Sequence, residues 1–372
     1  MKLFLCRIVC YKQHMKPRKR KSAAYPARLK KPLFIMAPMA NVTDSVFRKL
    51  FAKYGKPDVT WTEFVSADGL ISPGRENLLH DLEYSSKERP IVAQLFTGHP
   101  DAMRAAAKLA AGMKFDGIDI NMGCPDRAVE RQGGGASLIR DPKAALAVLE
   151  AARQGVADAA RLRRAKQPIP VSVKTRIGYN ALDLEWIRLL LRQRLPMLTV
   201  HLRTRKEMSD VPAHWEIMQE IVHMRDEESP ETLIIGNGDV MGISDGLAKI
   251  RASGCDGVMI GRGIFGQPWL FEDIHARGGP RDVRERTPEE RLSVMIEHAR
   301  AFERAYGPKK GTHGASTRGL KSFAIMRKHF KAYVNGWPGA AELRAELMTA
   351  ENVKAISAIV KRWSRAHKGK SA

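Results

Sequence analysis

The sequence predicts an α/β protein, a (β/α)8 TIM barrel followed by a C-terminal helical domain. From residue 33 onward, short apolar runs rich in β-forming residues alternate with longer segments of helical periodicity, as in a parallel α/β domain. Eight such runs lie between residues 33 and 263, a number and span that favour a closed barrel over an open doubly wound sheet. Beyond residue 288, helical segments follow one another with no strand pattern between them.

Almost every one of the eight predicted strands is apolar in its first part and carries a polar residue or a glycine toward its end. They are LFIMAPM (33–39), VTWTEFV (59–65), IVAQLF (91–96), GIDINMG (117–123), IPVSVKTRIG (169–178), MLTVHLRT (197–204), TLIIGNGD (232–239) and GVMIGRG (257–263). The polar residues toward or just after their ends are Gln94, Cys124, Lys174, Arg176, His201, Arg203, Asn237, Asp239 and Arg262. The C-terminal ends of barrel strands meet on one face, where barrel enzymes carry their active sites. We therefore expect these side chains to share one site.

Three regions are predicted: a basic N-terminal extension (1–31), the barrel (32–288) and the helical domain (289–372). The extension holds eleven Lys or Arg residues and no acid, and the first acidic residue of the chain is Asp44. This composition predicts disorder. It is also compatible with an RNA-binding arm or with an organellar transit segment, because such segments are basic and poor in acids. We expect a cytoplasmic protein, with an organellar location as the alternative.

The charge of the chain indicates a polyanionic partner. Lys and Arg outnumber Asp and Glu by 63 to 40, a formal charge of +23, and nucleic acid is the leading candidate for such a surface. In the predicted helix RGLKSFAIMRKHFKAYVNG (318–336), basic residues lie beside aromatic ones, and this face could contact phosphates. The basic residues are Arg318, Lys321, Arg327, Lys328 and Lys331. The alternative is the solvated face of an ordinary helical bundle.

Several classes of protein are not indicated. No run of 18 apolar residues occurs, so no membrane contact is expected. The four cysteines, Cys6, Cys10, Cys124 and Cys255, are too few and too scattered for a disulfide framework, and no metal site is expected. No GxGxxG dinucleotide fingerprint occurs. We expect a monomer.

The last two predicted strands indicate a phosphate site. They end in GNGD (236–239) and GRG (261–263), and glycine-rich ends followed by a helix N-terminus form the usual phosphate site of a barrel after strands 7 and 8. Lys174 would place a cation in the barrel mouth, where burial without an anionic partner is costly. Its partner is either an electron-rich ligand or Asp119 on the neighbouring strand.

The motifs together resemble the tRNA-dihydrouridine synthases, flavoenzymes that reduce uridine in tRNA. The resemblance covers residues 33–345 and rests on MAPMANVTDSVFR, TEFVSADGL, VAQLF, DINMGCPDRAVERQGGGASLI, VSVKTRIG, TVHLRT, IIGNGDV and GVMIGRG in this order. It implies tRNA as substrate, FMN as cofactor and NADPH or NADH as electron donor. The positions that it implies for FMN are Pro38, Met39, Ala40, Gln94, Lys174, His201, Asn237, Gly238, Asp239, Gly261 and Arg262.

Cys124 falls on the catalytic position of that family. Reduction of the uracil C5=C6 bond needs a hydride at C6 and a proton at C5, and a thiol with a pKa near ~8.5 is mostly protonated at neutral pH. We expect Pro125 to fix the turn after the strand, and the glycines at 133–135 to let the backbone approach a flat substrate or cofactor. The alternative for Cys124 is a small core residue.

The expected contacts with the RNA substrate are Asn121, Arg176, Lys321, Arg327 and Lys328. Two other functions stay open at this point. One is an FMN-dependent barrel oxidoreductase that acts on a free pyrimidine-type molecule, which would not need the charge of +23. The other is a non-catalytic RNA-binding barrel protein, which would not need Cys124.

Overall fold

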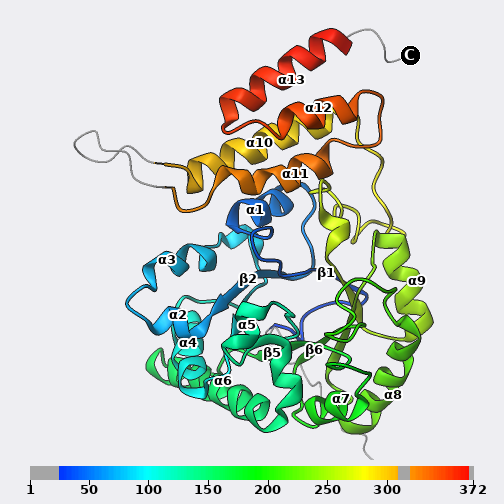
Figure 1. Cartoon of the computed structure of the whole chain (residues 1–372). Helices are drawn as coiled ribbons and strands as arrows, with labels where there is room; N and C mark the ends of the chain where they lie inside the picture. Colours follow the sequence, from blue (N-terminus) through cyan, green and yellow to red (C-terminus); the bar gives the residue numbers. More distant parts are fainter. Residues whose placement is uncertain (1–24, 309–318, 368–372) are drawn as a thin grey trace, which may run out of the picture.

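The computed structural model describes residues 25–308 and 319–367. In this part of the chain, eight parallel strands form one sheet in the order β1-β8-β7-β6-β5-β4-β3-β2. A parallel bridge between Ile35 and Val59 joins the two ends of this order and closes the ring. The predicted TIM barrel with a C-terminal helical region is confirmed (Figure 1).

Each strand overlaps the run predicted for it. The strands are β1 (Leu33–Met36), β2 (Thr60–Ser66), β3 (Ile91–Phe96), β4 (Gly117–Met122), β5 (Val171–Arg176), β6 (Met197–His201), β7 (Leu233–Asn237) and β8 (Gly257–Ile260). Most predicted runs extend beyond the observed strand at their C-terminal end, because their polar and glycine residues belong to the loops of the active face.

The helices around the barrel are α1 (Ser45–Tyr54), α2 (Ala67–Ile71), α3 (Glu76–Leu79), α4 (Pro100–Gly112), α5 (Arg127–Arg131), α6 (Pro142–Leu162), α7 (Leu184–Leu191), α8 (Met218–Glu228) and α9 (Ile243–Ser253). Short 3-10 turns lie at His80–Leu82, Ser86–Glu88, Gly135–Arg140, Trp215–Ile217 and Arg262–Ile264. An aspartate side chain caps the first turn of four helices, through Asp44, Asp126, Asp141 and Asp183. These caps satisfy backbone N–H groups that a helix start leaves without partners, and so they fix where each helix begins.

The alternation of side chains along β4 gives the barrel a polar interior. Ile118, Ile120 and Met122 belong to the apolar core between the strands and the surrounding helices. Because successive strand residues face opposite sides, Asp119 and Asn121 point into the barrel. Register pairs Asp119 with Gln94 and Ser172, and Asn121 with Lys174, so these polar side chains form successive layers that rise toward the C-terminal face.

The helical module consists of α10 (Pro288–Tyr306), a 3-10 turn (Phe323–Ile325), α11 (Met326–Tyr333), α12 (Ala340–Leu347) and α13 (Val353–His367). It packs over α1 at one side of the barrel (Figure 1). α10 begins one residue before the predicted boundary, at a capping box formed by Thr287 and Glu290. The helix predicted over 318–336 is shorter than expected, because the Ser322 side chain caps a 3-10 turn before α11 starts.

The structure describes residues 25–31, the last part of the predicted basic extension. Tyr25 is 8% exposed and packs beneath the barrel with Leu33 and Trp61. A side chain at Gly117 would lie 2.9 Å from the Tyr25 ring, so this glycine is what admits the ring. The basic cluster KPRKRK (16–21), Cys6 and Cys10 lie outside the described residues. No helix in the described ranges is long and apolar enough to cross a membrane.

Candidate active site

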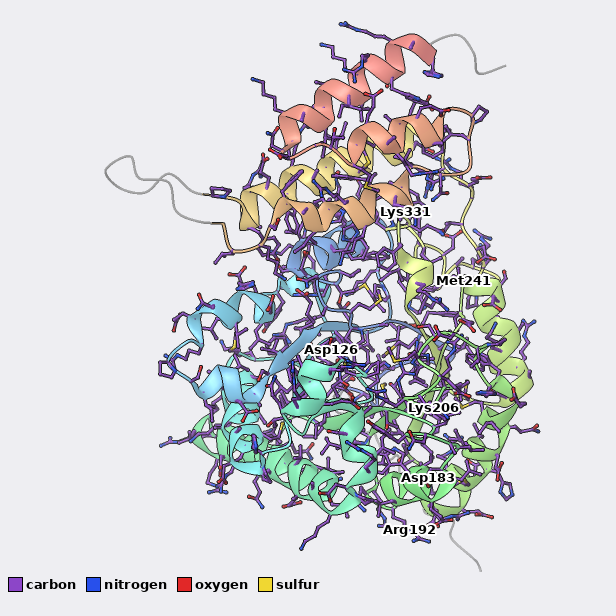
Figure 2. All side chains as sticks on the ribbon, viewed as in Figure 1. Asp126, Asp183, Arg192, Lys206, Met241 and Lys331 are labelled. Atoms are coloured by element: carbon purple, nitrogen blue, oxygen red, sulfur yellow. The ribbon has the colours of Figure 1, made fainter. Side chains whose placement is uncertain are left out.

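A cavity of about 270 Å³ opens at the C-terminal ends of the strands. It is lined by Ala37, Pro38, Met39, Phe64, Gln94, Asn121, Gly123, Cys124, Pro125, Lys174, Arg176, His201, Arg203, Ser209, Asn237, Gly238, Asp239, Val240, Met241, Gly261 and Arg262. Figure 2 labels Asp126 at the start of α5, Lys206 after β6 and Met241 after β7, all in loops that follow the C-terminal ends of strands. Every residue expected to contact FMN lines the cavity except Ala40, which is exposed because residues 39–43 form a turn that carries it outward.

Cys124 lies two residues beyond β4 and is half-buried. Its backbone N–H donates to Oδ1 of Asn121 at 2.9 Å, and the N–H of Gly123 donates to the same oxygen at 3.1 Å. Burial raises the pKa of the Cys124 thiol above its ordinary value, although Lys174 and Arg176 act in the opposite direction. The thiol is therefore protonated at neutral pH, as a proton donor must be.

Asn121 belongs to a hydrogen-bonded chain that crosses the barrel interior. Its amide nitrogen donates to Oε1 of Gln94 at 3.2 Å, and Nε2 of Gln94 donates to Asp119 at 2.7 Å. Ser172 donates to the other oxygen of Asp119 at 2.5 Å. Burial raises the pKa of Asp119 to about 6, against the effect of these hydrogen bonds. The chain connects a carboxylate at the barrel centre to the loop that carries Cys124.

Lys174 points into the cavity from β5. Within residues 25–308 and 319–367 its ammonium has no hydrogen-bond or ion-pair partner, and Asp119 is bonded to Gln94 and Ser172 instead. Burial lowers the pKa of Lys174 to about 8, and Arg176 contributes in the same direction. A desolvated ammonium is costly without an acceptor. The sequence alternative of an Asp119 partner is therefore not what the structure shows, and the lysine is left for an electron-rich ligand.

Arg176 connects two loops of the active face. Its guanidinium donates to the backbone carbonyl of Gly123 at 2.8 Å and to that of Thr204 at 2.9 Å. It lines the cavity but is only 5% exposed, and burial lowers its pKa to about 10. Arg176 thus holds the Cys124 loop against the loop after β6, besides its expected contact with substrate.

Asp239 is shared by two arginines. It accepts from buried Arg203 and, at 2.6 Å, from Arg262, and its position after Gly238 requires a positive φ of 48°. The bond from Arg203 lowers the pKa of Asp239 to about 2. Its charge is therefore neutralised within the protein, and it orients the arginines. Burial and the surrounding cations lower the pKa of His201 well below its ordinary value, so this imidazole is neutral.

Two expectations about the loops need correction. The N–H groups of Ile243 and Ser244 at the N-terminus of α9 are not available to a phosphate, because they donate to Asp282 at 2.7 and 3.1 Å. The glycines at 133–135 do not line the cavity. They bring this loop against its neighbours instead: a side chain at Gly135 would lie 2.6 Å from the carbonyl oxygen of Cys124, and one at Gly134 would lie 3.0 Å from the backbone nitrogen of Thr97.

Of the basic residues expected to contact RNA from the helical module, the structure exposes some and buries another. Arg327 and Lys328 are exposed, as is Lys331, which Figure 2 labels on α11. Lys321 is not available to phosphate, because its ammonium lies between Glu63 at 2.6 Å and Asp81 at 2.8 Å. Arg318 lies outside the described residues.

Several cavity residues were not singled out from the sequence as site residues. They are Ala37, Phe64, Gly123, Ser209, Val240 and Met241. Ala37, Phe64 and Gly123 fall within predicted strand runs, so their position near a strand end was the available signal. Ser209 lies in the irregular loop after β6, where no periodicity indicates which residues turn inward.

These features define a barrel enzyme with a cationic cavity and a protonated thiol at its mouth. A family model described as dihydrouridine synthase (Dus) matches residues 35–366. A probable tRNA-dihydrouridine synthase of Staphylococcus aureus (strain COL) is 37% identical over 337 residues, 90% of this chain and 94% of the relative. A probable tRNA-dihydrouridine synthase 2 of Bacillus subtilis (strain 168) is 35% identical over 340 residues, 91% and 95% of the two chains. The chain belongs to the dihydrouridine synthase family.

Proposed function

We propose that this protein reduces uridines in tRNA to 5,6-dihydrouridine, with FMN as bound cofactor and NADPH or NADH as electron donor. The observation that carries the proposal is a thiol kept protonated by burial, at the mouth of a cationic cavity, in a chain of the dihydrouridine synthase family. The family supports the reaction, and the cavity supports the cofactor and the role of Cys124.

The donor set of the cavity fits FMN. Among the described residues, four basic side chains line it, Lys174, Arg176, Arg203 and Arg262, against the single carboxylate of Asp239. Since Asp239 is already bonded to two arginines, the cavity favours an anionic or electron-rich ligand. Lys174 and Gln94 would hold the flavin ring, and Arg262 with the backbone around Gly238 and Gly261 would hold the phosphate. When bound and reduced, FMN supplies the hydride that C6 of the uracil accepts.

The residues of the chain complete the reaction with a proton. Cys124 donates the proton of its thiol to C5, and the two electrons of the former double bond form the new C–H bond there, so the product gains one hydride and one proton. The thiolate left on Cys124 lies near Lys174 and Arg176, which favour the charged form. Solvent then returns the proton. Burial thus keeps the thiol protonated before the transfer, and the two cations stabilise the thiolate after it.

The substrate is proposed to lie across the barrel mouth and the helical module. Arg327, Lys328 and Lys331 are exposed on α11 and can contact phosphates of the tRNA backbone. A free pyrimidine would not need these contacts, and a non-catalytic RNA-binding protein would not need a thiol in the cavity. Neither alternative is therefore favoured.

The proposal is tested with purified protein, FMN, NADPH or NADH, and an unmodified tRNA transcript. Nucleoside mass spectrometry should show uridine converted to a product heavier by two hydrogen atoms, only when all components are present. Reduction of free uridine at a comparable rate would support the small-molecule alternative. Binding of tRNA by a protein that takes up no flavin would support the non-catalytic one.

A further inference from the structure

The turn after β1 forms one wall of the cavity, through Ala37, Pro38 and Met39. Asn41, in the same turn, adopts a left-handed backbone with φ of 56°, which a non-glycine residue adopts only when its surroundings stabilise it. Its N–H donates to Oε1 of Glu63 at 2.5 Å. Glu63 lies on β2 and does not itself line the cavity. It therefore supports the turn from outside the cavity, through its hydrogen bond with Asn41.

The buried carboxylate of Glu63 is paired with a residue of the helical module. Its side chain is 5% exposed, and its second oxygen accepts from Nζ of Lys321 at 2.6 Å. Burial raises the pKa of Glu63, and the ammonium of Lys321 is the first effect that opposes it. The pair is separated by 258 positions in the sequence and joins the barrel to the segment that leads into α11.

Lys321 is surrounded by acidic groups from several elements. Besides Glu63 it pairs with Asp81, and Asp44 at the start of α1 has one buried carboxylate oxygen with no partner among residues 25–308 and 319–367. The ring of Tyr306 lies 5.2 Å from the ammonium. Burial lowers the pKa of Lys321, but Glu63 and Asp81 raise it above its ordinary value, so the lysine stays charged. Without it, buried carboxylates would face one another.

We infer that Lys321 is a positioning residue for the cofactor: by holding Glu63 it fixes Asn41, and so the cavity wall of Ala37, Pro38 and Met39. The inference rests on the proposed use of FMN. It means that the helical module completes the cofactor site as well as contacting tRNA. A purely structural role, in which Lys321 only attaches the module to the barrel, predicts lost stability with unchanged cofactor binding.

The test compares Lys321→Met with Lys354→Met, a matched change at an exposed lysine of α13 in the same helical module. FMN affinity is measured by flavin fluorescence, at a temperature where melting curves show both variants folded. Lys321→Met should weaken FMN binding about tenfold, the size of a missing charge-assisted hydrogen bond, and Lys354→Met should bind as the unmodified protein does. Unchanged affinity in Lys321→Met would overturn the inference.

The double variant Lys321→Met/Glu63→Gln makes the test specific. Glutamine keeps an oxygen for the N–H of Asn41 and needs no neighbouring cation, so FMN affinity should recover toward that of the unmodified protein. Failure to recover would contradict the route through Glu63. Hydrogen exchange at residues 37–43 without FMN supplies a second readout: it should accelerate in Lys321→Met alone. If the unmodified protein does not bind FMN, the proposed function fails, and exchange still decides whether Lys321 holds the turn.

Discussion

Oδ1 of Asn121 accepts a hydrogen bond from the backbone N–H of Cys124 at 2.9 Å. This is the last in a series of hydrogen bonds that starts at Asp119, and in each of them the identity of the donor and the acceptor is determined by the one before. A carboxylate in its charged form can only accept, so Asp119 requires Gln94 to present its amide nitrogen. The carbonyl of Gln94 then faces the amide nitrogen of Asn121, whose own oxygen faces Cys124. Asp119 thus determines how two amides of the cavity are oriented, although it does not line the cavity itself.

This direction predicts different results for two substitutions of Asp119. Asp119→Leu leaves the amide of Gln94 buried without an acceptor, which should cost about 1–3 kcal/mol of stability and change the rate at which iodoacetamide alkylates Cys124. Asp119→Asn can still accept from Gln94 while its amide donates to Ser172, so both properties should stay near those of the unmodified protein. Equal alkylation rates in all three proteins would show that Asp119 does not act on Cys124.

Lys174 predicts how FMN affinity depends on pH. Its pKa is lowered to about 8 by burial, so the free protein loses this charge as the pH rises through that value. An anionic ligand favours the charged lysine, and FMN affinity should therefore be highest below pH ~8 and fall from there toward pH ~9.5. Lys174→Arg should bind with little dependence on pH in this range, because arginine stays protonated. Fluorescence titrations at several pH values measure this, and an equal decline in both proteins would assign it to another group.

The exposed face of α11 predicts the salt dependence of tRNA binding. Replacing Arg327, Lys328 and Lys331 by glutamine should reduce the slope of log affinity against log salt by roughly 0.7 to 0.9 for each phosphate that is no longer bound by a basic side chain. The bound flavin should be unaffected. Lys166 is a suitable control, because it is exposed in the loop that precedes β5, at the opposite end of the barrel. If Lys166→Gln flattens the slope as much as the α11 variant does, the RNA site lies elsewhere.

Two buried histidines between α1 and the helical module predict a loss of stability in acid. The rings of His298 and His329 lie 4.6 Å apart and contact Phe47, and their nitrogens have no partner within the described residues. Burial lowers the pKa of His298 to about 3 and that of His329 well below its ordinary value. Since unfolded histidine titrates near ~6.5, their stabilising contribution is complete above that pH and decreases as the pH falls toward the folded values.

The measurement is the free energy of unfolding in urea between pH ~7 and pH ~5, for the unmodified protein and for His298→Phe. Each histidine contributes up to about 1.4 kcal/mol per pH unit below its unfolded pKa. The difference in unfolding free energy between the two proteins at each pH gives the contribution of His298 alone. Carboxylates such as Asp119 titrate in the same range and change the stability in the opposite direction, but they are present in both proteins and cancel. Parallel pH curves would show that His298 is hydrated or paired in solution.

The sequence predicts the barrel well because its signals are local. In β4 the alternation of Ile118, Asp119, Ile120 and Asn121 assigns each side chain to the helix layer or to the interior, and strand ends bring the cavity residues together. Contacts between distant segments could not be predicted. No pattern in the local sequence shows that Lys321 pairs with Glu63 or that Gly135 packs on the Cys124 loop. Nor does any show that Asp282 accepts hydrogen bonds from the first N–H groups of α9. Each depends on tertiary packing that periodicity does not report.

Cys124 carries the central claim, that a protonated thiol supplies the proton for C5. Cys124→Ala should keep the fold and FMN, and its flavin should still be reduced by NADPH or NADH, because the thiol takes no part in those steps. Transfer to tRNA should slow by about 10²- to 10⁴-fold, the usual effect of losing a positioned acid. Cys255, a buried cysteine beside β8, is the matched control, and Cys255→Ala should lower stability but leave transfer normal.

The most direct measurement is a single turnover: pre-reduced Cys124→Ala is mixed with unmodified tRNA without oxygen, and flavin reoxidation is followed together with dihydrouridine formation. We expect both to stay slow at saturating tRNA, while Cys255→Ala and the unmodified protein react at the same fast rate. Reoxidation and dihydrouridine formation at that fast rate in Cys124→Ala would contradict the assignment of Cys124 as the proton donor.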